Sequence, residues 1–489
     1  MRLVLRLDPS CLRRWHVHLA MRLAQRPDLR VGVEWAAAGE RLPSAVPLLF
    51  TLERLIHGLP CDDAVDAAKT DDLAPFLAVG GEPPDLVVDF SGGSPRAGER
   101  TWHVTFDGSP GEGAMLAALA QWRTPVVAVI DASNGAEIAS GHPGTETSGI
   151  LVLAFKDVLA RTATLVVAAI DRTAARKVAE APRPAAVNAR AVARFAVRSL
   201  SGTLASWLYH LCYNAPHWRV GWRYVDGADV VDLRAHPLGG WRDLPDDGRR
   251  FYADPFPVAK NGRTYLFVEE FQHRLGRGII SAVAFDDAGP VGTPQPVLEA
   301  ASHLSYPFVF EHRGSTWMVP ESCATGTIDL YRAAPFPDRW VKEATLLSGF
   351  DASDATLFEH DGRWWMLATV RDGGGAYSDA LYAWSAHDLF GPWQPHRRNP
   401  VLVDIGHARP AGRVVRRNGK LIRPFQDCRK GYGVALGLAE ITRLDDDVFA
   451  QRVEAVLHTG PLWPGRRLHT LNRAGRLECI DGSARSRRF

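Results

Sequence analysis

The sequence predicts a multidomain chain: an α/β domain over residues 1–180, a joining segment over 181–215, and an all-β five-bladed propeller over 216–489. Three observations predict this fold class. The chain has 489 residues, too many for one hydrophobic core, so two or three domains are expected. Strand-like and helix-like patterns alternate in the first third of the chain. A strand–turn–strand unit then recurs five times in the second half.

Residues 1–180 alternate short apolar strands with amphipathic helices. Apolar residues at helical spacing predict two helices, at 12–26 and 44–58. Short apolar runs predict strands at 3–7, 29–35, 84–90, 101–107 and 124–131. Strands that alternate with helices favour a largely parallel sheet.

Residues 181–215 join the two parts. Proline and alanine at 181–185 indicate a linker, and 187–212 has the apolar spacing of a helix. One interpretation packs this helix between the domains, because a two-domain chain needs an interface. The other uses Arg190, Arg194 and Arg198 beside the apolar face to lay the helix on a membrane surface. Peripheral membrane contact through 187–212 is therefore an open expectation.

From residue 218 the chain repeats a hairpin whose turn contains glycine. Asn-Gly and Asp-Gly turns are strong hairpin signals, because a type I′ turn needs positive φ at both central positions. A period near 50 residues with several strands per unit predicts a propeller, here with five blades. The last unit is short, so segments 218–224 and 229–233 are expected to complete its blade and close the ring. The turn glycines are Gly262, Gly314, Gly362, Gly419 and Gly475.

Equivalent positions of the blades are expected to meet, because the innermost strands of a propeller line its central channel. Charged side chains recur eight residues before the turn glycines and seven or eight residues after them. Several carboxylates together with Arg and His suit glycosyl chemistry, which needs a base or nucleophile and a proton donor of raised pKa. The predicted catalytic residues are Asp254, Asp354 and Glu321, and the predicted substrate-binding residues are Glu270, Tyr306, His407, Arg409, Asp427, His469 and Asp481.

An acidic residue at a strand end has a simpler explanation, because it can cap a turn or pair with an arginine. Asp254 and Asp354, however, stand at the same position of the first and third units. Their repetition favours function for this pair.

Four short motifs in the second half of the chain together form a recognisable sequence pattern. They are Phe-Tyr-Ala-Asp-Pro-Phe at 251–256, Ser-Tyr-Pro-Phe-Val-Phe at 305–310, Pro-Glu-Ser at 320–322 and Asp-Ala-Ser-Asp-Ala at 351–355. With them, residues 218–489 resemble the five-bladed propellers of arabinanases, levansucrases and invertases. They also resemble the propeller domain that accompanies the transferase in plant glucosamine inositolphosphorylceramide transferases.

The arabinanase resemblance implies that Asp254 is the base or nucleophile and that Asp354 tunes the site. The proton donor of those hydrolases is a Glu that opens the fourth blade, and here that place reads Gly-His-Ala-Arg-Pro at 406–410. This departure lowers the expectation of simple hydrolysis. Arg409 and His407 would suit a phosphate-bearing glycosyl donor or an acidic sugar. The acid would have to come from Glu321, Glu270 or Asp427.

The first domain carries a weaker pattern: Pro-Asp-Leu-Val-Val-Asp at 84–89, Trp-His-Val-Thr-Phe-Asp-Gly at 102–108 and Pro-Val-Val-Ala-Val at 125–129. It resembles a degenerate form of the Rossmann-type N-terminal domain of formyltransferases. Those enzymes use an Asn-x-His motif, whereas this chain has His103-Val104-Thr105. We expect His103 to be an ordinary strand residue and the domain to keep a ligand crevice or an interface.

Composition narrows the class of protein. The formal net charge of +2 gives no reason to expect a nucleic-acid partner. The six cysteines are far apart, and neither a secretory signal nor an apolar stretch of transmembrane length is evident, so a cytoplasmic location is expected. No cofactor is expected, and no ligand spacing requires a metal. Enrichment in Ala, Arg, Gly and Pro indicates a bacterial gene of high GC content.

The sequence thus predicts a carbohydrate-active protein whose partner is a saccharide or glycoconjugate. Glycosyl transfer in the propeller channel is favoured over hydrolysis, because the hydrolase acid is missing. A non-catalytic glycan-binding module is an alternative, as is a formyltransferase that acts on a nucleotide-linked amino sugar.

Overall fold

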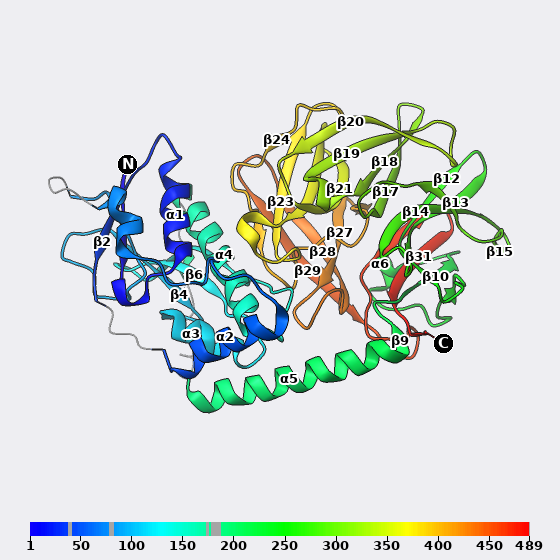
Figure 1. The fold of residues 1–489 in the computed structure, drawn as a ribbon. Helices are drawn as coiled ribbons and strands as arrows, with labels where there is room; N and C mark the ends of the chain where they lie inside the picture. The colour runs from blue at the N-terminus through cyan, green and yellow to red at the C-terminus, as the bar shows by residue number, and fades with distance from the viewer. Residues whose placement is uncertain (38–41, 78–82, 173–175, 178–186, 489) are drawn as a thin grey trace. The chain divides into compact units, whose positions relative to one another are not determined.

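The computed structural model describes residues 1–37, 42–77, 83–172, 176–177 and 187–488 (Figure 1). Contacts within the chain divide it into two compact units. The α/β unit is Met1–Ala205 with Asp372–Ala376, and the propeller unit is Ser206–Arg371 with Tyr377–Phe489. Residues 181–186 of the predicted linker lie outside the described residues.

The α/β unit is built on one sheet with the strand order β2-β1-β3-β4-β6-β7-β8. Strands β2, β1, β3 and β4 are parallel, and β6 and β7 continue the sheet antiparallel. The strands are β1 (Arg2–Leu7), β2 (Arg30–Trp35), β3 (Leu86–Asp89), β4 (Thr101–Phe106), β5 (Ser109–Pro110), β6 (Val127–Asp131), β7 (Ala136–Gly141) and β8 (Arg176–Lys177). The helices are α1 (Arg14–Ala24), α2 (Ala45–His57), α3 (Glu112–Leu119) and α4 (Leu151–Ile170).

The expected strands and helices of this unit are present close to their predicted bounds. His103 lies within β4, as predicted for an ordinary strand residue. The sheet, however, is mixed, because every pairing from β4 through β6 and β7 to β8 is antiparallel. A Rossmann-type sheet is mostly parallel. The Rossmann-type assignment is therefore not supported.

Helix α5 (Ala189–Cys212) contributes to both units, since the division falls at Ala205. Its first half packs on the α/β unit, where the Ser199 hydroxyl donates to the Gly149 carbonyl at 2.5 Å and the Phe195 ring lies 5.3 Å from that of Trp122. Every residue from 200 to 212 is exposed. Packing of this helix between the two domains stays a prediction. No helix among the described residues is both long and apolar enough to cross a membrane.

The propeller unit contains five sheets of four or five strands, which confirms the predicted number of blades, and a two-stranded sheet of β9 (Tyr213–Asn214) and β32 (Ser486–Arg487). Blade one contains β12 (Arg250–Lys260), β13 (Arg263–Gln272), β14 (Arg277–Asp286), β15 (Gly289–Pro290) and β16 (Gln295–Leu298). Blade two contains β17 (Ser305–His312), β18 (Ser315–Glu321), β19 (Thr327–Ala333) and β20 (Trp340–Ser348). Blade three contains β21 (Ala352–His360), β22 (Arg363–Val370), β23 (Ala380–Ala386), β24 (Gln394–Pro395) and β25 (Leu402–Val403). Blade four contains β26 (Val415–Arg417), β27 (Lys420–Asp427), β28 (Ala435–Leu444) and β29 (Phe449–His458).

Blade five closes the ring by combining strands that are distant in sequence. Its order is β11-β10-β31-β30, with β10 (Trp218–Tyr224), β11 (Arg242–Asp243), β30 (Leu471–Ala474) and β31 (Leu477–Ser483). Trp218 pairs with Ser483, so the green β10 lies beside the red β31 in Figure 1. Segment 218–224 thus closes the blade as predicted, but 229–233 does not. Val230–Leu233 forms the short helix α6 instead, because the Asp229 side chain accepts from the Asp232 N–H and caps it.

Four of the five predicted turns have the backbone of a type I′ turn. Positive φ occurs at both central residues of Asn261-Gly262, Arg313-Gly314, Asp361-Gly362 and Asn418-Gly419. The left-handed backbone twists the turn in the sense of its two strands. These hairpins therefore fix the register of the two inner strands in each of the first four blades.

Glycine is required in blade four for a different reason. A Cβ built at Gly437 would lie 1.9 Å from Cζ of the buried Phe425 on the neighbouring strand. We expect Gly437→Ala to lower the free energy of unfolding by about 2 kcal/mol, because Phe425 has to leave its rotamer. At Gly362 a Cβ meets no atom within 4 Å, so Gly362→Ala is expected to cost about 1 kcal/mol from its positive φ alone. Denaturant unfolding of both variants measures the difference, and equal losses would contradict the packing argument.

Candidate active site

The inner strands of the first three blades share an irregularity that aims one side chain in each. Their pairing slips between Ala253 and Phe256, between Ser305 and Phe308, and between Ser353 and Thr356. The extra residue in each bulge has positive φ: 48° at Asp254, 41° at Tyr306 and 57° at Asp354. Left-handed backbone at a non-glycine residue costs about 1–2 kcal/mol and bends the strand. The position eight residues before each turn glycine is therefore structurally equivalent in these blades.

Asp254 is held by hydrogen bonds from two other blades. Its carboxylate accepts from the Tyr306 N–H at 3.1 Å in blade two and from the Thr470 hydroxyl at 2.9 Å in blade five. Its own N–H donates to Asp481 at 2.8 Å. The side chain is 7% exposed. Asp254 is thus fixed on the inner face of the ring with little access to water.

His469 and Asp481 form a buried pair beside Asp254. The His469 Nδ1 lies 2.6 Å from Asp481 Oδ1, and its Nε2 lies 3.9 Å from Asp254 Oδ1. The imidazole stacks on Trp218 at 4.1 Å between ring centroids. Burial alone lowers the pKa of His469, but Asp481 and Asp254 reverse this effect, so the pKa is raised above its ordinary value. The imidazole therefore favours its charged form between two carboxylates.

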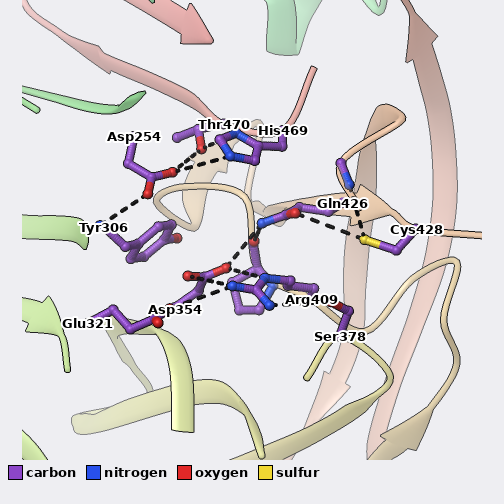
Figure 2. Close-up of polar contacts among 12 residues, drawn as sticks. Asp254, Tyr306, Glu321, Asp354, Ser378, Arg409, Gln426, Cys428, His469 and Thr470 are labelled. Atoms are coloured by element: carbon purple, nitrogen blue, oxygen red, sulfur yellow. Dashed lines mark hydrogen bonds and ion pairs between the residues drawn. The ribbon is translucent and has the colours of Figure 1, made fainter. Parts of the chain in front are cut away.

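Asp354 is the centre of a second group, which Figure 2 shows facing Asp254 across the site. The Arg409 guanidinium donates to Asp354 at 2.7 Å, and the Gln426 amide donates to the same oxygen at 3.0 Å. Arg409 also reaches Ser378 at 3.2 Å and lies 3.5 Å from Glu321. The arginine that stands where hydrolases have an acid is thus already paired with Asp354.

Seven charged residues make up what we call the channel cluster. Five lie on strands of blades one, two, three and five, Arg409 lies in the segment that bridges to β27 of blade four, and His469 lies just before β30 of blade five. The seven residues are Asp254, Glu269, Glu321, Asp354, Arg409, His469 and Asp481.

The carboxyl groups of the channel cluster differ in pKa. Burial raises the pKa of Asp254 to about 6; His469 opposes the shift, and Asp481 adds to it. Burial and the charges of Asp254 and Glu321 hold the pKa of Glu269 well above its usual range. Burial and Asp354 do the same for Glu321, although Arg409 works against them. Glu269 and Glu321 can therefore keep a proton at a pH at which Asp254 has lost its own.

The raised pKa of Asp254 has a consequence for stability. A carboxyl that binds its proton more tightly in the folded state stabilises the fold at low pH, and the benefit is lost as pH rises from about 4 through about 6. Asp254→Asn removes this loss. We expect the variant to gain up to about 3 kcal/mol of unfolding free energy relative to wild type between pH 4 and pH 7. Urea unfolding of both proteins across this range measures the gain, and a constant difference would show that Asp254 does not titrate there.

One predicted residue belongs to the other side of its strand. Glu270 is fully buried and bonded to Arg250 at 2.8 Å and Ser281 at 2.7 Å, away from the channel cluster. Its neighbour Glu269 takes the channel position, because successive side chains of a strand face opposite ways. Glu269 and Glu321 both stand seven residues after their turn glycine. This shared spacing was the signal that identifies Glu269.

Blade four repeats the same one-residue offset. Gln426, seven residues after its glycine, donates to Asp354, whereas the next residue, Asp427, forms an ion pair with Arg429 at 2.6 Å. His407 lies close to Asp404, at 2.7 Å, and its ring contacts Phe425. Asp427 and His407 are therefore each paired with a neighbour outside the cluster.

Tyr306 is a buried residue that supports the site through its backbone. Its hydroxyl contacts Thr356 at 2.9 Å and accepts from the Gly412 N–H at 2.8 Å, and its side chain is fully buried. No surface of Tyr306 is free for a substrate. Its contribution is the backbone N–H that holds Asp254.

Two aromatic side chains that the sequence did not single out frame the cluster. The guanidinium carbon of Arg409 lies 4.8 Å from the centroid of the Tyr432 ring. The Tyr432 and His469 rings are almost perpendicular, with centroids 5.3 Å apart. The Trp218 ring stacks on the His469 ring, with the centroids 4.1 Å apart. Flat aromatic faces next to carboxylates are suited to the apolar faces of sugar rings. Tyr432 sits between two glycines in a loop after a strand, which is the sequence signal for such a position.

Three side chains could together hold a metal ion: Asp254, His469 and Asp481, whose ligand atoms lie within 4.8 Å of one another. The atoms are already engaged, however. Asp481 Oδ1 accepts from the Thr470 N–H, and its other oxygen accepts from the Asp254 N–H. A cation would have to displace these bonds and the His469 contact, so the group fits an ion poorly.

A cavity of about 1300 Å³ lies beside the cluster within the propeller unit. Trp218 and Arg467 line it, and Arg467 also contacts the Tyr432 carbonyl, so the cavity and the cluster share a wall. The cavity is large enough for a group of several sugar rings.

Sequence comparisons place the propeller unit among known proteins. Residues 245–479 match the family described as the N-terminal region of glucosamine inositolphosphorylceramide transferase 1. The protein of that name from Arabidopsis thaliana is 34% identical over 260 residues, which cover 51% of this chain and 33% of the relative. The one from Oryza sativa subsp. japonica is 32% identical over 232 residues, 45% of this chain and 31% of the relative. This chain thus spans about a third of the length of these curated relatives.

The match leaves two expectations without support. It begins at residue 245, so the formyltransferase-like interpretation of residues 1–180 gains no support from it. The curated relatives are plant proteins, and they give no support to a bacterial origin.

Solved structures similar to the chain include several glycoside hydrolases. A thermostable family-43 glycoside hydrolase shares 14% identity at a TM-score of 0.32 and covers 44% of this chain and 78% of its own. An exo-1,5-α-L-arabinanase from a bovine ruminal metagenomic library shares 13% identity at a TM-score of 0.33 and covers 50% and 99%. Likeness at this level carries no conclusion about activity.

Proposed function

We propose that the propeller unit is a carbohydrate-active enzyme that transfers a glycosyl group at the channel cluster. One observation carries the proposal: carboxylates of unequal pKa converge from separate blades around a paired arginine in a nearly water-free site. The matched relatives, which are named transferases of a glycoconjugate, agree with this choice.

The cluster offers each role that glycosyl transfer needs. Asp254, with a pKa of about 6, accepts the proton of the incoming hydroxyl group near neutral pH. Glu321, whose pKa is held well above its usual range, keeps its proton and can donate a hydrogen bond to the departing oxygen as the glycosidic bond breaks. Asp354, fixed by Arg409 and Gln426, provides negative charge beside the positive charge that develops on the sugar.

Burial favours transfer over hydrolysis. Asp354 and His469 are each 2% exposed, so bulk water has little access to the atoms that would activate it. An acceptor sugar that fills the site brings its own hydroxyl and excludes water further. A phosphate-bearing donor is the preferred substrate class, because a phosphate departs without a proton and the carboxylate expected at 406–410 is missing.

A second function is supported by the hydrogen bonds of two carboxylates of the cluster. Asp254 and Asp481 already accept several hydrogen bonds, as structural carboxylates do. The propeller unit would then be a glycan-binding module, with ligand in the cavity and no chemistry at the cluster.

A panel of nucleotide sugars, sugar phosphates and short oligosaccharides tests both functions on the full chain. We expect product from a phosphate-linked donor, detected by mass spectrometry. Saccharide binding without any product would favour the glycan-binding module. Neither binding nor product across the panel would overturn both proposals.

A further inference from the structure

The cavity beside the channel cluster is basic. Among the described residues that line it, five are Lys or Arg and none is Asp or Glu. Over the whole chain Lys and Arg number 57 and Asp and Glu number 55, so the imbalance is local to this cavity. Its lining comes from residues 209–219, 430–434, 464–467 and 483–485, all of the propeller unit. The five lining cations of this basic cavity are Arg219, Lys430, Arg466, Arg467 and Arg485.

Three of these cations have no acidic partner among the described residues. Lys430, Arg466 and Arg485 are exposed, and none of them forms an ion pair with a described carboxylate. The residue next to Lys430 behaves differently, because Arg429 pairs with Asp427 at 2.6 Å. Three positive charges at the basic cavity are therefore available to an anionic ligand.

The loop that carries Arg466 is packed against the last strand of blade five. The Arg466 N–H donates to the Ser483 hydroxyl at 3.1 Å. A Cβ built at Gly482 would lie 2.2 Å from the Arg467 carbonyl oxygen, so the loop approaches β31 this closely only because the residue there is glycine. Arg466 therefore reaches the basic cavity from a backbone whose position is fixed by packing.

A two-stranded sheet fixes a second part of the wall. Strand β32 pairs with β9, and Arg485 directly precedes β32. The N–H of the residue before Arg485 donates to the His217 carbonyl at 2.8 Å. Tyr209 and Tyr213 line the cavity beside this sheet and stack on each other, with ring centroids 4.8 Å apart. This wall thus combines a held cation with a flat aromatic pair.

The basic cavity and the channel cluster share the segments that carry their residues. Trp218 lines the cavity and stacks on His469. Arg467, two residues before His469, donates to the Tyr432 carbonyl. Lys430 stands two residues before Tyr432, whose ring contacts the arginine of the cluster. An anion in the cavity would therefore lie next to the wall that holds the cluster.

We propose that the basic cavity binds the diphosphate group of the glycosyl donor. This inference rests on the proposed function, because it assigns a place to the leaving group of that reaction. A diphosphate is a compact, multiply charged anion, and unpaired Lys and Arg side chains are its usual partners in proteins. The cavity has three such side chains in a lining without acidic residues.

This assignment also accounts for the acid that is missing from residues 406–410. The bond between the anomeric carbon and the phosphate oxygen breaks, and its electron pair stays on the diphosphate. The acceptor oxygen forms the new bond to that carbon, and Asp254 takes the acceptor's proton. The cations of the basic cavity stabilise the charge of the released diphosphate, so that it departs without being protonated.

Three probes that share the diphosphate group test the site by calorimetric titration of the full chain at about 0.1 M salt. They are inorganic pyrophosphate, uridine diphosphate and farnesyl diphosphate. All three are expected to bind, and uridine diphosphate about tenfold more tightly than pyrophosphate, because its base can stack on an aromatic side chain such as Tyr209. Tightest binding of farnesyl diphosphate would instead identify a lipid-linked donor at the same site. Failure of all three to bind would overturn the proposal, as would binding of trigalacturonic acid alone, which would assign the cavity to an acidic glycan.

The triple variant Lys430→Ala, Arg466→Ala, Arg485→Ala is expected to bind each diphosphate about 100-fold more weakly. Its thermal melt is expected to match that of wild type, because the three side chains are exposed and carry no ion pair with a described residue.

The matched control removes three exposed arginines of other blades: Arg313→Ala, Arg397→Ala and Arg452→Ala. It changes the net charge by the same amount, and its affinity for the diphosphates is expected to stay within about twofold of wild type at this salt concentration. Equal weakening in the two triple variants would show that only overall charge matters and would overturn the site.

The Asp254→Asn variant separates this inference from the proposed function. It is expected to bind uridine diphosphate as wild type does, although it lacks the base. Diphosphate binding that the cavity variant loses, without product from any donor of the substrate panel, would reject glycosyl transfer and retain the site. Product from a diphosphate donor at an unchanged KM in the cavity variant would retain glycosyl transfer and reject the site.

Discussion

Replacing Asp254 with asparagine is expected to lower turnover at least about 1,000-fold while the protein stays folded. A positioned base contributes about 100- to 10,000-fold, and Asn cannot accept a proton from the incoming hydroxyl. The amide keeps the shape of the carboxyl and can still accept from the Tyr306 N–H or the Thr470 hydroxyl. Initial rates on the donor found by the substrate panel, with a thermal melt of the same sample, measure the effect.

Glu270→Gln is the matched control for this variant. Glu270 is a buried carboxyl on the strand that pairs with Asp254's strand, but it bonds Arg250 and Ser281 outside the cluster. Its replacement is expected to reduce stability and leave the rate within a few-fold of wild type. Equal loss of turnover in both variants would mean that Asp254 acts through folding alone.

Removing the charge of Arg409 is expected to produce the largest loss of stability. Arg409→Met leaves Asp354 buried without its ion-pair partner, and breaking a buried pair in this way costs about 3–5 kcal/mol. The same change removes the bonds to Ser378 and the contact with Tyr432. The free energy of unfolding in urea measures the loss.

Two companion variants make the result specific. Adding Asp354→Asn to Arg409→Met is expected to restore much of the stability, because no buried charge is then left unpaired. Arg429→Met breaks the pair with Asp427, but the Arg429 side chain is 48% exposed, so less than about 1 kcal/mol is expected. A loss from Arg409→Met no larger than that from Arg429→Met would show that the buried pair adds nothing.

The repeat allowed much of the propeller to be predicted from sequence. Turn glycines set the blades, and counting back from them found Asp254, Tyr306 and Asp354, which share a bulge and positive φ. Counting forward was accurate only to one residue. In a strand that error moves a side chain to the opposite face, so the count predicts Glu270 although Glu269 takes the channel position.

Long-range partners could not be predicted in this way. The pairing of Arg409 with Asp354 joins residues that are far apart in sequence, and no local sequence pattern predicts it. Trp218 reaches His469 because β10 is added to the end of the ring. The apolar spacing predicts the helix at 187–212. It does not predict which of these residues are exposed, because exposure depends on tertiary contacts.

The closing blade also affects how the chain folds. Strand β10 is synthesised before the first four blades and must wait for β31, the strand it pairs with along most of its length. Until β31 emerges, β10 is an unpaired edge with apolar side chains, open to association with other chains. Pairing across so long a stretch of chain is slow to form. Completion of the ring is therefore expected to be the last step in the folding of the propeller unit, once β31 has emerged, and the step most sensitive to protein concentration.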